Sequence, residues 1–110
     1  MRMTIPVARV LAALLSEPDV DRYGLDLMRM TDLASGTLYP VLHRLQAAGW
    51  LAADWESVDP ASVGRPARRY YRLTAEGVTA ARRALAELRS LAPDSGRVLG
   101  GADPAGAPAW

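Results

Sequence analysis

The sequence lacks cysteine, lysine and phenylalanine altogether, and it has a single histidine among its 110 residues. Without cysteine, neither a disulfide nor a thiolate metal site can form. His43 alone cannot supply the two imidazoles of a two-histidine metal site within one chain. No apolar stretch approaches the roughly 20 residues of a membrane helix, and the N-terminus has no secretory signal. We therefore expect a cytoplasmic protein with no metal and no cofactor.

Arrangements of residues that carry catalysis are equally scarce. The acidic residues that could pair lie in loops or alternate along a strand, where solvated charges are the simpler interpretation. No glycine-rich loop stands between a strand and a helix, as a phosphate-binding loop requires. The sequence therefore predicts no catalytic residue and a protein that is not an enzyme.

Charge is distributed unevenly although the chain carries a formal net charge of only +1. Residues 1–64 contain five arginines against eight acidic residues, whereas residues 65–89 contain seven arginines against two. Arginine binds phosphate and guanine with two parallel hydrogen bonds, which lysine does not do. A local basic segment of this kind can bind phosphates while the rest of the surface stays mildly acidic.

Helical periodicity dominates the first half of the chain. Thr4 is a suitable N-cap for a first helix, whose apolar stripe consists of Val7, Val10, Leu11, Leu14 and Leu15. A second helix is expected over Tyr23–Met30. Ser35 is a suitable N-cap for a third helix that runs to about Ala48 and is closed by Gly49.

The period then changes from helix to strand. Alternation over residues 51–56 predicts a half-buried strand, and residues 68–73 form a second β-rich segment after a loop with two prolines and a glycine. Thr74 is expected to cap a fourth helix that reaches Ala92. Residues 93–110, rich in Pro, Gly and Ala, are expected to be a disordered tail.

Three helices, a two-stranded hairpin and a last helix predict a mainly α, winged helix-turn-helix fold. Such a fold presents its third helix to the major groove of DNA and its hairpin, the wing, to the backbone or minor groove. The outward residues of the third helix can all donate or accept hydrogen bonds there: Thr37, Tyr39, His43 and Arg44. The wing carries four further candidates: Arg65, Arg68, Arg69 and Arg72. Ion pairs to Asp54, Glu56 and Asp59 are the structural alternative for any one of these arginines.

The last helix is too long for one small core to cover. We expect its end to meet a second copy of the chain through Leu85, Leu88, Leu91 and Ala92, with Leu14 and Leu15 of the first helix contributing. The predicted organisation is a DNA-binding domain over 1–73, a dimerisation helix over 74–92 and the tail over 93–110. A homodimer should bind a pseudo-palindromic duplex. A winged-helix adaptor that binds proteins instead of DNA is the alternative.

Specific sequence blocks agree with this fold. The segments 23–27 (Tyr-Gly-Leu-Asp-Leu), 35–45 (beginning Ser-Gly-Thr-Leu-Tyr-Pro), 49–51 (Gly-Trp-Leu) and 64–77 (beginning Gly-Arg-Pro and including Tyr-Tyr-Arg-Leu-Thr) resemble the PadR family of regulators, in register over roughly residues 5–92. The chain is similar to the short branch of that family, which has one C-terminal helix. Two positions depart from the family pattern: Ala67, where a basic residue is common, and Gln46, where Glu is usual.

The resemblance implies a dimer and repression of transcription. It also implies DNA contacts at the matched positions, which are Tyr23, Ser35, Gly36, Thr37, Tyr39, His43, Arg44, Arg65 and Arg68. Relatives of this family bind aromatic compounds in a dimer cavity, so a small-molecule effector is a further implied partner. Residues 74–92 contain no aromatic side chain, and we therefore expect no aromatic sandwich built from that helix.

Overall fold

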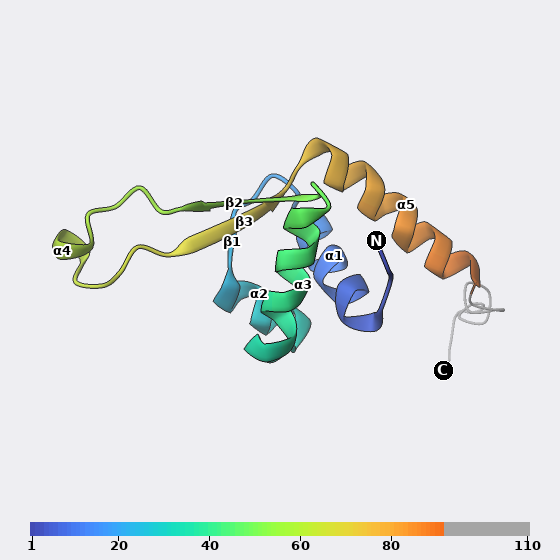
Figure 1. Ribbon diagram of the computed structural model, residues 1–110, viewed down its shortest axis with the longest axis horizontal. Helices are drawn as coiled ribbons and strands as arrows, with labels where there is room; N and C mark the ends of the chain where they lie inside the picture. The colour runs from blue at the N-terminus through green and yellow to red at the C-terminus, as the bar shows by residue number, and fades with distance from the viewer. Residues whose placement is uncertain (92–110) are drawn as a thin grey trace, which may run out of the picture.

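The computed structural model describes residues 1–91 (Figure 1). The predicted tail over 93–110, and Ala92 before it, lie outside the described residues. The elements of the described part are, in order, α1 (Ile5–Ser16), β1 (Arg22–Tyr23), α2 (Gly24–Thr31), α3 (Ser35–Ala47), β2 (Leu51–Trp55), α4 (Pro60–Val63), β3 (Arg69–Leu73) and α5 (Ala75–Leu91). The predicted order of helices and hairpin is confirmed, with two additional short elements, β1 and α4.

The core lies where α1, α2 and α3 meet. Most of the apolar stripe of α1 is buried there, and Val7, Val10 and Leu11 have no exposed surface. Leu27 of α2 and Leu38 of α3 are likewise fully buried. Each buried leucine stabilises the fold by about 1.5–3 kcal/mol relative to an exposed one, so these three short helices hold one another in place.

The predicted helix ends are correct at three of four places. The Thr4 hydroxyl accepts a hydrogen bond from the backbone N–H of Val7 at 3.3 Å, and Gly49 follows α3 with a positive φ of 80°. The Thr74 hydroxyl accepts from the N–H of Gly77 at 2.9 Å and caps α5. The prediction for Ser35 is wrong, because Ala34 is the N-cap, and Ser35 is already the first residue of α3.

The sheet has three antiparallel strands in the order β1-β3-β2, one more than the sequence predicts. Arg22 and Tyr23 pair with Tyr71 and Tyr70, so Tyr23 ends β1 and does not begin α2 as predicted. A strand of two residues carries no periodicity, which explains why the pattern missed it. Strand β3 lies in the middle of the sheet, and two of its side chains, Tyr71 and Leu73, are buried.

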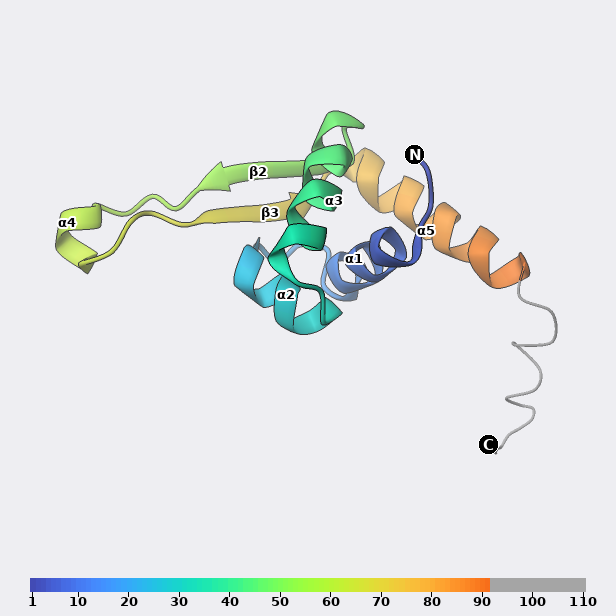
Figure 2. The same ribbon diagram turned by 60° about the horizontal axis from the view of Figure 1, so that its bottom comes forward.

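The wing projects well beyond the helices, and α4 lies at its tip (Figures 1 and 2). The sequence predicts only a loop here. Asp59 nucleates the short helix because its carboxylate accepts from the N–H of Ala61 at 3.1 Å, and Gly64 ends it with a φ of 72°. The wing is thus an ordered arm.

Helix α5 is anchored at its N-terminal end and extends away from the body (Figure 1). The N–H of Thr74 donates to the carbonyl of Trp50 at 3.0 Å, and the Thr74 hydroxyl donates to the carbonyl of Gly49 at 2.8 Å. A Cβ at Gly77 would overlap the backbone of Trp50, so only glycine permits this close approach. Within residues 1–91, no helix has the length and apolar character needed to cross a membrane.

Candidate nucleic-acid interface

Helix α3 divides its residues cleanly between core and surface. Leu38, Val41, Leu42 and Leu45 are at most 1 % exposed. The residues that the sequence predicts as DNA contacts on this helix are all exposed: Ser35, Gly36, Thr37, Tyr39, His43 and Arg44. Helix α3 itself lies beside the root of the wing (Figure 2). A groove of DNA can therefore reach these six residues without displacing any core side chain.

One of the two glycines near this face makes room for a neighbouring side chain, and the other does not. A Cβ at Gly24, the first residue of α2, would overlap the Tyr39 hydroxyl, so this glycine lets Tyr39 lie against the start of α2. A Cβ at Gly36 would meet nothing within 4 Å. Glycine inside a helix costs about 0.5–1 kcal/mol relative to alanine. The fold gains nothing from Gly36, and its missing side chain leaves open surface at the N-terminal turn of α3.

The arginines at the root of the wing are held in different ways. The Arg68 guanidinium lies 5.7 Å from the centre of the Tyr23 ring, and that of Arg69 lies 5.2 Å from the centre of the Trp55 ring. Among the described residues neither forms an ion pair with a carboxylate, whereas Arg72 Nε lies 2.9 Å from Asp21 Oδ1. Cation–π contact leaves the positive charge intact, so Arg68 and Arg69 remain available to an anion.

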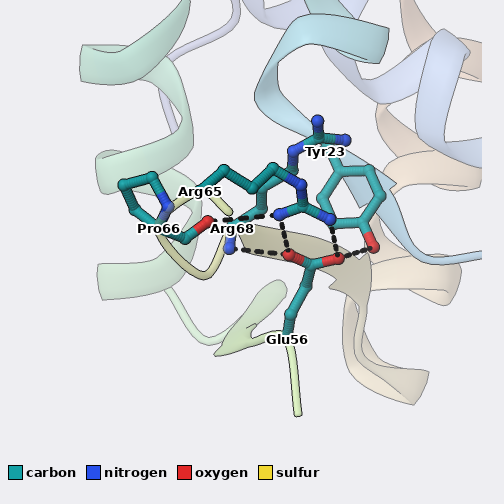
Figure 3. A network of polar contacts seen from close by, with 5 residues as sticks. All are labelled: Tyr23, Glu56, Arg65, Pro66 and Arg68. Carbon is teal, nitrogen blue, oxygen red and sulfur yellow. Dashed lines mark hydrogen bonds and ion pairs between the residues drawn. The ribbon is translucent and has the colours of Figure 1, made fainter. Parts of the chain in front are cut away.

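Arg65 has a different environment, because it binds Glu56. Figure 3 shows the Glu56 carboxylate between the Arg65 guanidinium and the Tyr23 hydroxyl. The two Arg65 nitrogens donate to the two carboxylate oxygens at 2.6 and 3.3 Å, and the Tyr23 hydroxyl donates to Oε2 at 3.0 Å. The backbone N–H of Arg68 donates to Oε1 at 2.9 Å. We call Glu56 with these three partners the Glu56 cluster.

The electrostatics of the Glu56 cluster follow from these hydrogen bonds. The Arg65 guanidinium, followed by the Arg68 N–H, lowers the pKa of Glu56 from 4.5 to about 2. The same Glu56 contact raises the pKa of Tyr23 and that of Arg65. At neutral pH the cluster is therefore an ionised carboxylate with protonated donors on every side.

A hollow opens between α2, α3 and β3. Its lining includes three tyrosines and three arginines, namely Tyr23, Tyr39, Tyr71, Arg29, Arg68 and Arg69. Three of the predicted DNA-contacting residues, Tyr23, Tyr39 and Arg68, thus line one surface feature. The sequence does not point to Arg29. It offers Glu56 only as one of three possible ion-pair partners for a wing arginine, since nothing in a local pattern reports which loop arginine returns to which strand.

The predicted dimer residues separate into two groups. Leu14 is 2 % exposed in the core of its own chain, so its assignment to a dimer interface is wrong: it has almost no surface left to offer. Leu15 and Leu85 are half-buried against that core. Leu88 and Leu91 are 38 % and 76 % exposed. An apolar groove between α1 and α5 is lined by residues that include Met3, Ile5, Ala8, Ala12, Leu85 and Leu88.

Three packed helices, a projecting antiparallel wing beside the third, and a C-terminal helix define a winged-helix protein. The family model described as the transcriptional regulator PadR-like family matches residues 10–83. The chain belongs to this family, whose members are transcriptional regulators and not enzymes, as the sequence predicts.

One curated relative agrees with the family assignment, and two solved structures share the fold. Transcriptional regulator Rv3488 of Mycobacterium tuberculosis is 51 % identical over 59 residues, which cover 51 % of this chain and 50 % of the relative. The match thus spans half the length of that relative. A PadR-like transcription factor from Bacteroides fragilis has a similar structure, with a TM-score of 0.64 and 24 % identity over 77 % of this chain and 81 % of the other. Bordetella bronchiseptica BpsR, at 21 % identity, aligns over 94 % of this chain and 70 % of its own with a TM-score of 0.69.

Proposed function

We propose that this protein binds duplex DNA sequence-specifically as a homodimer and represses transcription from the site it occupies. The observation that carries the proposal is the exposed face of α3, which gathers six residues able to contact DNA on the side opposite a fully buried leucine and valine face. Donors and acceptors in the major groove distinguish all four base pairs, and a helix of this kind fits that groove. Repression follows where the bound site overlaps a promoter, and it is the behaviour that the family resemblance implies.

Within this proposal the two parts of the interface have separate tasks. Thr37, His43 and Arg44 read base edges or fix the helix on phosphates, and Ser35 and Gly36 allow the N-terminal turn of α3 to approach the backbone closely. Arg68 and Arg69 bind phosphates flanking the groove, since their charges are not matched by a carboxylate within residues 1–91. Phosphate contacts supply affinity and base contacts supply specificity.

Footprinting on the DNA around the protein's own gene tests the proposal, because small regulators commonly control neighbouring genes. Two protected half-sites about 10 base pairs apart, one helical turn, are expected from a two-fold dimer. Protection of no duplex above the nonspecific level would contradict DNA recognition and would favour the alternative, a winged-helix adaptor for another protein.

The homodimer is proposed to form through the apolar groove between α1 and α5. Of its lining residues, Ile5 is 72 % exposed and Leu88 is 38 % exposed, and Leu91, further along α5, is 76 % exposed. A two-fold mate that inserts its own α5 would bury the same residues twice, which is how an isologous interface works. The interface therefore uses the Ile5–Ala12 face of α1, with Leu15 and Leu85 supporting it from the core.

The dimer is tested with Leu88→Asp and Leu91→Asp combined in the full chain. Because both leucines are exposed in one subunit, the variant should fold normally, scatter light as a monomer and lose tight operator binding, since one half-site alone is weak. Val20→Asp is the matched control: Val20 is 39 % exposed but lies outside the groove, so this variant should remain dimeric. A wild-type protein that is monomeric at micromolar concentration would contradict the interface.

Release of DNA by a small-molecule effector completes the proposal. BpsR is a neighbour whose DNA binding is regulated by 6-hydroxynicotinic acid. In this chain the hollow between α2, α3 and β3 could hold a planar anion against its tyrosines and arginines, and it shares Tyr39 and Arg68 with the proposed DNA face. Titrating 6-hydroxynicotinic acid and related aromatic carboxylates into the protein–DNA complex should release the DNA. If none of them does, effector control fails and DNA recognition stands.

A further inference from the structure

Glu56 lies at the point where the wing leaves the sheet, directly after β2. It is joined to the returning segment by a reciprocal pair of bonds. The N–H of Glu56 donates to the carbonyl of Arg68 at 2.7 Å, while the N–H of Arg68 donates to the Glu56 carboxylate at 2.9 Å. The two residues thus close the wing loop at its base, and the side chain of Glu56 continues the ladder where the strands end.

The carboxylate also connects the wing to the rest of the protein. Its four hydrogen bonds use most of the acceptor capacity of two carboxylate oxygens, and its side chain is only 11 % exposed. The donors come from β1, from the loop after α4 and from the residue before β3. One side chain therefore joins β1, at Tyr23, to the returning arm of the wing, at Arg65 and Arg68.

Arg65 cannot leave this cluster without consequence. Its side chain is 33 % exposed and its charge is matched by Glu56 at 2.6 Å. If Arg65 moved to a DNA phosphate, a nearly covered carboxylate would be left without its cation and close to a polyanion. Removing one partner from a partly buried, hydrogen-bonded pair leaves the other with an unmatched charge, which costs more than the pair itself contributes. Arg68 and Arg69, which rest on aromatic rings, can meet a phosphate without breaking an ion pair.

We propose that Glu56 is a positioning residue for DNA binding: it holds the wing loop in its binding geometry before DNA arrives and, by retaining Arg65, assigns the phosphate contact to Arg68. This inference rests on the proposed function. It changes the role of Arg65 from a DNA contact, as the sequence predicts, to a structural partner of Glu56. It also assigns the Tyr23 hydroxyl to the wing and not to a phosphate.

The first experiment needs no DNA. Hydrogen exchange of the Arg68 amide is measured by NMR in the full chain for wild type and Glu56→Gln. Loss of the charge should speed exchange of this amide about tenfold, because the bond that protects it would end on a neutral amide oxygen and no longer be charge-assisted. Asp54→Asn is the matched control, since it neutralises an acid two residues earlier whose carboxylate accepts from the adjacent Trp55 N–H. Equal exchange rates in wild type and Glu56→Gln would overturn the positioning role, whether or not the protein binds DNA.

The second experiment measures how affinity for the footprinted duplex falls with salt, because each phosphate contact adds about one to the slope of log K against log salt. Arg68→Met should reduce this slope by about one. Arg65→Met should leave it unchanged in the wild-type background and reduce it in the Glu56→Gln background, where Arg65 is released. A reduced slope for Arg65→Met in the wild-type background would overturn the assignment, as would an unchanged slope in both backgrounds.

Discussion

Helix α3 and the wing both carry residues that the sequence predicts to contact DNA, yet the two are prepared in different ways. On α3 the outward side chains Thr37, His43 and Arg44 are exposed and none forms a hydrogen bond or ion pair with another described side chain. On the wing, the carboxylate of Glu56 already accepts hydrogen bonds from Arg65 and from Tyr23 of β1. The outward side chains of α3 are therefore free to bind DNA, whereas polar contacts within the protein hold the wing in one conformation.

This difference follows from the physics of the two elements. A helix satisfies its backbone hydrogen bonds internally, so packing one face on the core orients the other face at no further cost. A wing of two strands has few apolar contacts beyond its root, and an isolated hairpin is marginally stable in water. It needs polar side chains to keep its geometry, and Glu56 and the capping residue Asp59 supply them.

The largest effect on DNA binding should come from the uncommitted face of α3. His43→Ala together with Arg44→Ala should weaken operator binding about 100-fold, because each lost contact to a base or phosphate is worth about 1–3 kcal/mol. Thermal stability should not change, since both side chains are exposed. Fluorescence anisotropy with labelled operator DNA measures the affinity. The control is Arg82→Ala with Arg83→Ala on α5, which removes at least as much positive charge. An equal drop in operator affinity in this control would mean that the loss reflects nonspecific charge and not contacts made by α3.

A smaller and more selective effect is expected at Gly36. Alanine at this position meets no neighbour, so Gly36→Ala should raise the free energy of unfolding by about 0.5–1 kcal/mol, as removal of a helical glycine does. The same methyl group occupies surface that DNA should approach, and operator affinity should fall about tenfold, a loss of about 1.4 kcal/mol. Thermal denaturation and fluorescence anisotropy on one sample test the expected gain in stability and the expected loss of affinity.

Gly24→Ala sharpens this comparison. Its Cβ would overlap the Tyr39 hydroxyl, the outer end of a side chain that is 43 % exposed and can turn aside. The variant should therefore lose operator affinity through displacement of Tyr39, with little loss of stability. If Gly36→Ala lost stability, an internal requirement for that glycine would replace the DNA-based explanation.

The α3 face could be predicted from sequence because one periodic pattern marks both its buried and its exposed residues. Leu38, Val41 and Leu45 define the inward stripe, and the outward positions follow by geometry. The order of the main elements was predictable for the same reason. Caps were predictable where a side chain is the cap, as at Thr4 and Thr74, and the prediction failed at Ala34, where the backbone alone begins the helix.

The wing could be predicted only as a hairpin with a basic tip. Strand β1 has two residues, and α4 has four, so neither offers a period to recognise. The pairing of Glu56 with Arg65, nine residues along the chain, depends on how the loop folds back, and several acids were equally available as partners. Leu14 is predicted at the dimer interface but is buried within its own chain. An apolar stripe identifies which residues are buried but not whether a partner subunit is needed to bury them.

The smallest expected effect is the loss of protection at the Arg68 amide when Glu56 is protonated at acid pH. The pKa of this carboxyl falls from 4.5 to about 2 because it accepts hydrogen bonds from Arg65 and Arg68 in the folded protein. A lowered pKa means that the ionised form stabilises the folded wing above pH 4.5, and that this contribution is lost as the pH falls towards 2. The Arg68 amide should therefore stay protected from exchange at pH 4, after correction for the intrinsic rate, and lose its protection only near pH 2. An NMR titration of the Glu56 carboxyl carbon gives the midpoint directly, and Glu56→Gln should show no such transition at Arg68. A midpoint near 4.5 would mean that Glu56 is an ordinary solvated acid and that the wing is as uncommitted as α3.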